Sequence, residues 1–185
     1  MPKQKFTHRI GLFGGSFDPL HVGHILLGRW AREALRLDEV WFVPQAQSAD
    51  GKQLSSALRR WRALEAALKR EHALRACDVD LRLGGVSRTV ETLRQLQYEN
   101  GPGVEWTWLL GQDQALRLPT WLEAEALPKL CKFSFFVRPG VAPVPKSIHT
   151  RFRCSAIQVP SIEISSSWIR LQAQARKKID LAQAL

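Results

Sequence analysis

Apolar residues occur along this chain in short runs that alternate with longer stretches in which they recur every three or four positions. Short apolar runs are typical of buried strands, and the longer spacing is typical of amphipathic helices. The runs predict strands near residues 8–13, 40–44, 79–83, 106–110, 133–137 and 156–159. The helical spacing predicts helices over 23–35, 55–69, 89–98 and 167–175.

Strands that alternate with helices are typical of a parallel sheet covered on both faces. We therefore expect an α/β fold, a Rossmann-like doubly wound parallel sheet of about five or six strands with helices on both faces. The polar stretch 45–52 predicts a loop, and the prolines and glycine within 138–150 predict irregular structure. A length of 185 residues without internal repeats suits one domain that spans 1–185.

The composition, with 45% hydrophobic residues, is that of a soluble globular protein. No stretch approaches the roughly 18 consecutive apolar residues of a membrane span, and the first residues contain no apolar signal core. We expect a cytoplasmic protein that does not contact a membrane. Three widely spaced cysteines, Cys77, Cys131 and Cys154, predict neither a disulfide framework nor a zinc site.

The formal net charge of +10 changes the range of partners to consider. Such an excess of Lys and Arg suits a nucleic-acid binder, because these residues neutralise phosphates and release counterions. It equally suits an enzyme whose substrates are polyanions. The basic residues are spread over several predicted helices, a pattern typical of solvated helix faces.

The stretch 14–24 carries the clearest candidate chemistry. Gly14 and Gly15 directly follow the first predicted strand, where glycine allows turns closed to other residues and a close approach to a ligand. A purely steric need for small residues would give the same two glycines. His21 and His24, however, lie three residues apart at a predicted helix start, where unpaired N–H groups favour an anion. The stretch predicts a phosphate site, and the absence of G-x-G-x-x-G and Walker sequences argues against a dehydrogenase or a P-loop ATPase.

Three motifs resemble those of a known family. The stretch 14–24 resembles the G-x-F-D-P-x-H-x-G-H signature of the nucleotidyltransferase α/β-phosphodiesterase superfamily. Residues 164–170 resemble its I-S-S-T-x-I-R motif, with Ser167 in place of threonine. Residues 111–113 and 119–121 are similar to the G-x-D and P-T-W elements of the bacterial nicotinate-nucleotide adenylyltransferases. The motifs follow in order and cover nearly the whole chain.

This resemblance implies adenylyl transfer from ATP to nicotinate mononucleotide, giving deamido-NAD and pyrophosphate in NAD biosynthesis. It implies catalytic roles for His21, His24 and Arg170. ATP would be bound by Gly14, Gly15, Ser16, Phe17, Lys52, Gly111, Asp113, Ser165, Ser166 and Ser167. The pyridine mononucleotide would be bound by Thr89, Trp121 and Arg88. Mg²⁺ is implied as the companion of ATP, with no protein ligand assigned.

Several of these residues also have a purely structural interpretation. Serines before an amphipathic segment are common helix caps, and Asp113 stands where a turn follows a strand. A tryptophan such as Trp121 is usually part of a core, and Thr89 stands where the next helix begins.

Two departures from the family pattern affect the substrate. The family's P-P-H-K segment is replaced here by 44–52, so Lys52 lies in a loop without the stiffening prolines, and Arg88 replaces a tyrosine. A sister adenylyltransferase, acting on nicotinamide mononucleotide or phosphopantetheine, is therefore the alternative. A basic nucleic-acid-binding module with this fold is a third hypothesis, which the intact His21, His24 and Arg170 argue against. We expect no nucleic-acid partner, and the sequence does not define the oligomeric state.

Overall fold

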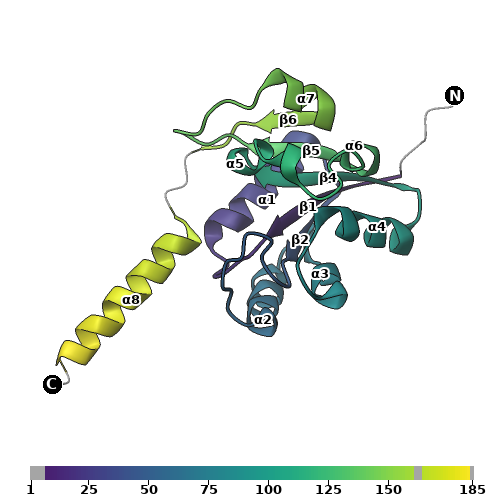
Figure 1. Ribbon diagram of the computed structural model, residues 1–185. Coiled ribbons are helices and arrows are strands. Elements are labelled where there is room, and N and C mark those ends of the chain that lie inside the picture. Colours follow the sequence, from purple (N-terminus) through teal and green to yellow (C-terminus); the bar gives the residue numbers. More distant parts are fainter. Residues whose placement is uncertain (1–6, 161–163, 184–185) are drawn as a thin grey trace, which may run out of the picture.

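Six parallel strands form one sheet in the computed structural model, which describes residues 7–160 and 164–183 (Figure 1). The strands are β1 (His8–Gly15), β2 (Glu39–Pro44), β3 (Leu74–Ala76), β4 (Val104–Gly111), β5 (Lys132–Phe136) and β6 (Cys154–Ile157). Their order is β3-β2-β1-β4-β5-β6, so the chain runs outward from β1 and then returns to its other side. This reversal between β1 and β4 is the place where such sheets bind ligands, beyond the carboxyl ends of the strands.

Successive residues of the central strands point to two separate cores, which confirms the doubly wound fold class. From β4, Trp106 and Trp108 join one core, whereas Leu109 joins the other. The first core also contains Val90 and Leu93 of a helix, and the second contains residues of two further helices. The helices are α1 (Val22–Leu35), α2 (Ala57–Leu68), α3 (Val79–Leu83), α4 (Thr89–Asn100), α5 (Gln112–Ala115), η1 (Leu118–Thr120), α6 (Leu127–Leu130), α7 (Lys146–Phe152) and α8 (Ser166–Gln183).

Three segments differ from the sequence prediction, and one of them is the helix predicted over 167–175, which extends to Gln183 as part of α8. The predicted strand 79–83 is wrong, because these residues form α3 and the third strand lies earlier, at Leu74–Ala76. Alternating apolar and polar residues favour a strand, but this short segment buries Val79 and Asp80 as one helical turn that ends at Gly84. The prediction of irregular structure over 138–150 is wrong for its last residues, which belong to α7. This helix begins directly after Pro145, and a proline at the start of a helix does not disturb it.

The last helix, α8, extends away from the sheet (yellow in Figure 1). Its first turn is attached to the loop after β1: Ser166 Oγ donates to the carbonyl oxygen of Pro19 at 2.9 Å, and the Arg170 guanidinium donates to the carbonyl oxygen of Asp18. The helix therefore brings its motif residues to the carboxyl end of β1. Across residues 7–160 and 164–183, we find no helix with the length and apolarity that a membrane span requires.

Candidate active site

A pocket of about 700 Å³ lies at the carboxyl ends of the central strands. It is bounded by the segments that follow β1, β2, β4 and β5 and by the start of α8. Every site residue predicted from the sequence lines it, except Ser167 and Arg170. The fold thus brings together residues that are about 150 positions apart, as expected for a site at the reversal of strand order.

The glycines at the end of β1 do not have the backbone conformation expected from the sequence. A Cβ on Gly14 would lie 2.6 Å from Cζ2 of Trp108, so the missing side chain lets the indole pack against β1. Neither Gly14 nor Gly15 has a positive φ, and the left-handed residue of this turn is Phe17, with a φ of 47°. Phe17 is buried and packs edge-on against His24, with ring centroids 5.1 Å apart. The expectation that the glycines adopt turn geometries closed to other residues is therefore wrong.

The rings of His21 and His24 pack against each other, with centroids 3.7 Å apart and planes tilted by 32°. The backbone N–H of His21 donates to Nδ1 of His24 at 3.2 Å, which leaves the proton of the neutral His24 ring on Nε2. Burial, together with the nearby His21 and Arg138, lowers the pKa of His24 to about 3. Burial also lowers the pKa of His21, whose Nδ1 has no hydrogen-bond partner within the described residues. The pair therefore faces the pocket as neutral rings.

A buried arginine, Arg60 of α2, ties together three segments around the pocket. Its guanidinium donates to the carbonyl oxygens of Ser55 and Ser16, both at 3.0 Å, and of Ala46 at 3.3 Å. The Asp18 carboxylate accepts hydrogen bonds from Oγ and N of Ser55, at 2.6 and 2.8 Å. Partial burial alone would raise the pKa of Asp18, but these hydrogen bonds hold it below its usual value. Both ends of the loop that carries Lys52 are thereby fixed.

Sequence reasoning missed Arg60 because it stands in a basic run that suggested a solvated helix face. The signal was its spacing: Arg60, Leu64 and Leu68 are four residues apart and are the buried residues of α2. A charged residue on the apolar stripe of a helix is buried only when its donors are satisfied. The position therefore predicts a structural arginine.

Asp113 and Arg138 meet where β4 and β5 end. Nη1 of Arg138 lies 3.5 Å from Oδ1 of Asp113, which is buried and accepts no hydrogen bond from a described residue. Gln112 fixes the segment after β5, since its Oε1 accepts from the Arg138 N–H at 2.8 Å and its Nε2 donates to the carbonyl oxygen of Ala142 at 2.8 Å. Arg138 was not among the predicted site residues, and no single motif in the sequence analysis pointed to it.

The loop before α4 forms another wall, with Arg88 and Thr89 facing the pocket. Thr89 is also the first residue of α4, so its structural interpretation holds together with its place in the pocket. Ser87 joins this loop to the segment after β2: its Oγ accepts from the Ala46 N–H at 2.9 Å. Asp80, which is buried, lies next to Ser87, and burial raises the pKa of the Asp80 carboxyl group.

Trp121 and Ser165 likewise combine two roles. Trp121 packs edge-on against Phe133, with ring centroids 6.4 Å apart, and also lines the pocket. Ser165 Oγ accepts from the Trp168 N–H at 3.2 Å and so caps the start of α8. Arg170 and Ser167 lie beside the pocket rather than in its lining, and the Arg170 guanidinium donates to Ser167 Oγ at 3.0 Å.

Comparisons with known proteins agree with this geometry. The family model described as cytidylyltransferase-like matches residues 12–172. A protein of Shouchella clausii named "Probable nicotinate-nucleotide adenylyltransferase" is 39% identical, over 92% of this chain and 87% of the relative. A protein of the same name from Bacillus cereus strain G9842 is 34% identical, over 91% of this chain and 87% of the relative.

Among solved structures, the nicotinic acid mononucleotide adenylyltransferase of Plasmodium falciparum, complexed with NaAD, has the same fold, with a TM-score of 0.74. The two chains are 22% identical, and the similarity covers 88% of this chain and 82% of the other. Because the family model spans most of the sequence and the relatives match nearly from end to end, this chain belongs to the cytidylyltransferase-like family, among the nicotinate-nucleotide adenylyltransferases.

Proposed function

We propose that the protein transfers the adenylyl group of ATP to nicotinate mononucleotide and releases pyrophosphate. The observation that carries the proposal is the pocket at the reversal of strand order, where His21 Nδ1 and Asp113 Oδ1 are buried polar atoms without a hydrogen-bond partner among the described residues, although Asp113 Oδ1 lies 3.5 Å from Nη1 of Arg138. Buried polar groups are nearly always hydrogen-bonded, so such atoms suit a polar ligand. The named relatives supply the substrate class.

The reaction requires positioning more than proton transfer. The acceptor phosphate attacks the α-phosphorus of ATP, a new P–O bond forms, and the bond to pyrophosphate breaks. Since the attacking oxygen is already anionic, the protein contributes alignment and donors where negative charge develops. The neutral His24 suits this role, because its Nε2–H donates without a prior change of protonation.

Cations and donors around the pocket would hold the phosphates. Lys52 and Arg138 line it, and the start of α8 adds backbone N–H groups of a helix terminus. Arg170 reaches the phosphates only if it exchanges its contacts to Asp18 and Ser167 for the pyrophosphate oxygens. We assign Oδ1 of Asp113, which accepts no hydrogen bond from a described residue, to the adenosine ribose, whose hydroxyl groups are donors.

Magnesium would arrive with ATP and neutralise phosphate charge. Both carboxylate oxygens of Asp18 already accept hydrogen bonds from Ser55, which leaves them poorly suited to bind a cation directly. Within the described residues, no three His, Cys, Asp or Glu side chains cluster as a metal site would require. The donor set therefore favours a cation held by phosphate oxygens and water.

For the acceptor, we assign the nicotinate ring to Trp121 and its carboxylate to the wall formed by Arg88 and Thr89. An aromatic face stacks on a pyridine ring, and the Arg88 guanidinium distinguishes a carboxylate from a neutral carboxamide by a full charge. This cation favours nicotinate mononucleotide over nicotinamide mononucleotide.

The decisive experiment measures pyrophosphate release by the purified protein with ATP and magnesium. Nicotinate mononucleotide, nicotinamide mononucleotide and phosphopantetheine are offered as separate acceptors. We expect a strong preference for the first. Activity with phosphopantetheine alone would remove the assignments of Trp121 and Arg88, and no release with any acceptor would contradict the proposed function itself.

A further inference from the structure

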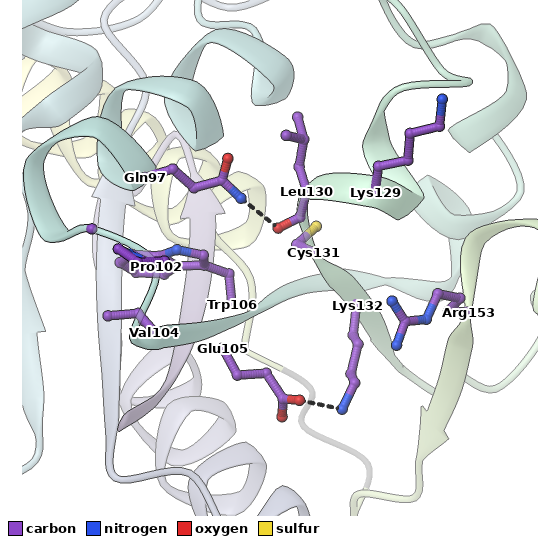
Figure 2. A pocket seen from close by; sticks show the side chains of 11 residues that line it. Gln97, Pro102, Val104, Glu105, Trp106, Lys129, Leu130, Cys131, Lys132 and Arg153 are labelled. Atoms are coloured by element: carbon purple, nitrogen blue, oxygen red, sulfur yellow. Dashed lines mark hydrogen bonds and ion pairs between the residues drawn. The ribbon is translucent and has the colours of Figure 1, made fainter. Parts of the chain in front are cut away.

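A second cavity, of about 420 Å³, lies at the amino-terminal ends of the strands, where β4, β5 and β6 begin (Figure 2). The first pocket lies at the opposite, carboxyl ends. Its volume falls within the range of small-molecule sites, roughly 300–1,000 Å³. It shares no lining residue with the pocket described above. A ligand here would therefore occupy a separate site.

Positive charge exceeds negative charge along the cavity wall. Lys129, Lys132 and Arg153 line it, against one carboxylate, Glu105. Glu105 is already engaged, because it accepts from Nζ of Lys132 at 2.6 Å and from Nε of Arg9 at 3.3 Å. Lys129 and Arg153 have no carboxylate oxygen within 4.0 Å in the described part of the chain. The wall thus carries two exposed cations without a carboxylate partner among the described residues, and Figure 2 shows Lys129 pointing away from Arg153. The Arg153 guanidinium is a fork that fits phosphate and carboxylate groups.

The rest of the wall is apolar and contains an unsatisfied donor. Val104, Leu130 and Trp106 line the cavity. Trp106 is 2% exposed, its ring packs edge-on against Trp41 at 5.5 Å, and its Nε1–H has no hydrogen-bond partner among the residues the structure describes. A buried donor without a partner calls for an explanation, such as a bound water or ligand.

We propose that this cavity binds a small organic anion. A phosphate, sulfonate or carboxylate head would pair with the Arg153 guanidinium, with a ring or short apolar body against Val104 and Leu130. An oxygen atom of the ligand, or a water molecule that it retains, accepts the Nε1–H of Trp106. Small inorganic anions satisfy the cations but leave the apolar wall uncovered, so they bind more weakly.

The tryptophans themselves report on the two sites. Trp106 lines the second cavity, whereas Trp108 and Trp121 line the first pocket. We would titrate phenyl phosphate into ¹⁵N-labelled protein and follow the indole N–H resonances, assigned with Trp→Phe variants. The expected result is a saturable shift of the Trp106 resonance, larger than with inorganic phosphate or with benzyl alcohol. Shifts confined to Trp108 and Trp121, or none, would overturn the proposal.

A charge-matched pair of double variants completes the test. K129A/R153A should weaken phenyl phosphate binding at Trp106 by at least about tenfold, because it removes both uncompensated charges. K69A/K146A loses the same charge at two exposed lysines outside the cavity and should bind as the parent does. Equal affinity in both variants would show that the cations do not form a site. Since the titration of the parent protein is independent of these variants, it decides the question even if one variant fails to fold.

Discussion

At the scale of single residues, His24 connects packing with chemistry. Its ring lies against Phe17 and His21, and its Nδ1 is occupied by a backbone N–H, so only Nε2–H is available to a ligand. The motif indicated the importance of this residue, but its protonation state follows from burial and from the nearby His21 and Arg138.

The buried neutral His24 makes stability depend on pH. Its pKa is about 3 in the folded protein and near 6.5 when unfolded, so between these values only the unfolded chain takes up the proton. Stability is therefore retained above pH 6.5 and lost as the pH falls below it, by up to about 1.4 kcal/mol per pH unit. In urea unfolding at a series of pH values, His24→Gln should lessen this slope, whereas the control His72→Gln, at an exposed histidine, should not.

His24→Ala should lower kcat far more than it raises the KM for ATP. A donor aimed at developing charge stabilises the transition state more than the bound substrate, and the loss of one such donor typically costs about 10²–10³ in kcat. Steady-state kinetics with ATP and nicotinate mononucleotide measures both constants. Parallel changes in kcat and KM would contradict the assigned role.

Gly14→Ala tests the contact between β1 and Trp108. The added Cβ would lie 2.6 Å from the indole, so the ring must move, and overpacking of this kind costs about 1–3 kcal/mol of unfolding free energy. Gly103→Ala is the control, since its Cβ would meet only the Thr7 hydroxyl, at 3.2 Å. Equal urea midpoints for the two variants would show that the Trp108 ring moves aside without a loss of unfolding free energy.

At the scale of elements, periodicity located most helices and strands, but it ended the last helix at 175 rather than 183 and misplaced the third strand. Helices α1, α2 and α4 carry apolar stripes over three or more turns, and the sequence located them within a few residues. In contrast, β3 has three residues and α3 has five, too few for a period to be recognised, and their structure is decided by the sheet beside them.

The same limit applies to the site. The loops after β1 and β4 and the start of α8 could be predicted because they carry contiguous motifs. Arg138 could not, because its partner carboxylate is brought to it from another segment by the fold. For Arg60 the spacing indicates burial, but not which carbonyl oxygens its guanidinium binds. Site residues that lie in contiguous motifs can be recognised in the sequence, whereas those positioned by contacts between distant segments cannot.

Arg60→Lys should release the loop that carries Lys52. A lysine cannot reproduce the fork that binds three carbonyl oxygens, and buried acceptors left without donors cost about 1–3 kcal/mol each. We expect lower stability, a higher KM for ATP and faster tryptic cleavage after Lys52. Arg59→Lys, at the exposed neighbouring position, is the matched control. Unchanged cleavage in Arg60→Lys would show that the loop is held by other contacts.

At the scale of the whole molecule, the net charge of +10 is best understood through the substrates. ATP, the mononucleotide and pyrophosphate are all anions, and a positive protein attracts them over distances set by the Debye length. The cations are nevertheless distributed over many elements and paired in many places, as in the Arg82–Glu99 and Arg94–Glu123 bridges. The positive charge therefore attracts anionic substrates over a distance as well as through contacts in the pocket.

Salt should consequently weaken the capture of substrate. Raising the ionic strength from about 0.01 M to about 0.3 M shortens the Debye length several-fold, and kcat/KM for both substrates should fall by roughly tenfold. The measurement is a series of steady-state assays in sodium chloride, with sucrose as a neutral control. If kcat/KM did not respond to salt, substrate capture would depend on contacts within the pocket alone.

The central position of β1 also has a consequence for how the protein is made. One edge of β1 pairs with β2, which is close to it in the sequence. The other edge pairs with β4, whose Val104 lies opposite His8, 96 positions earlier. Closing so long a loop is slow, and during synthesis this edge of β1 has no native partner until β4 has left the ribosome. In that interval an apolar strand edge is open to pairing with other chains. Yield on expression should therefore be most sensitive to substitutions that weaken β4.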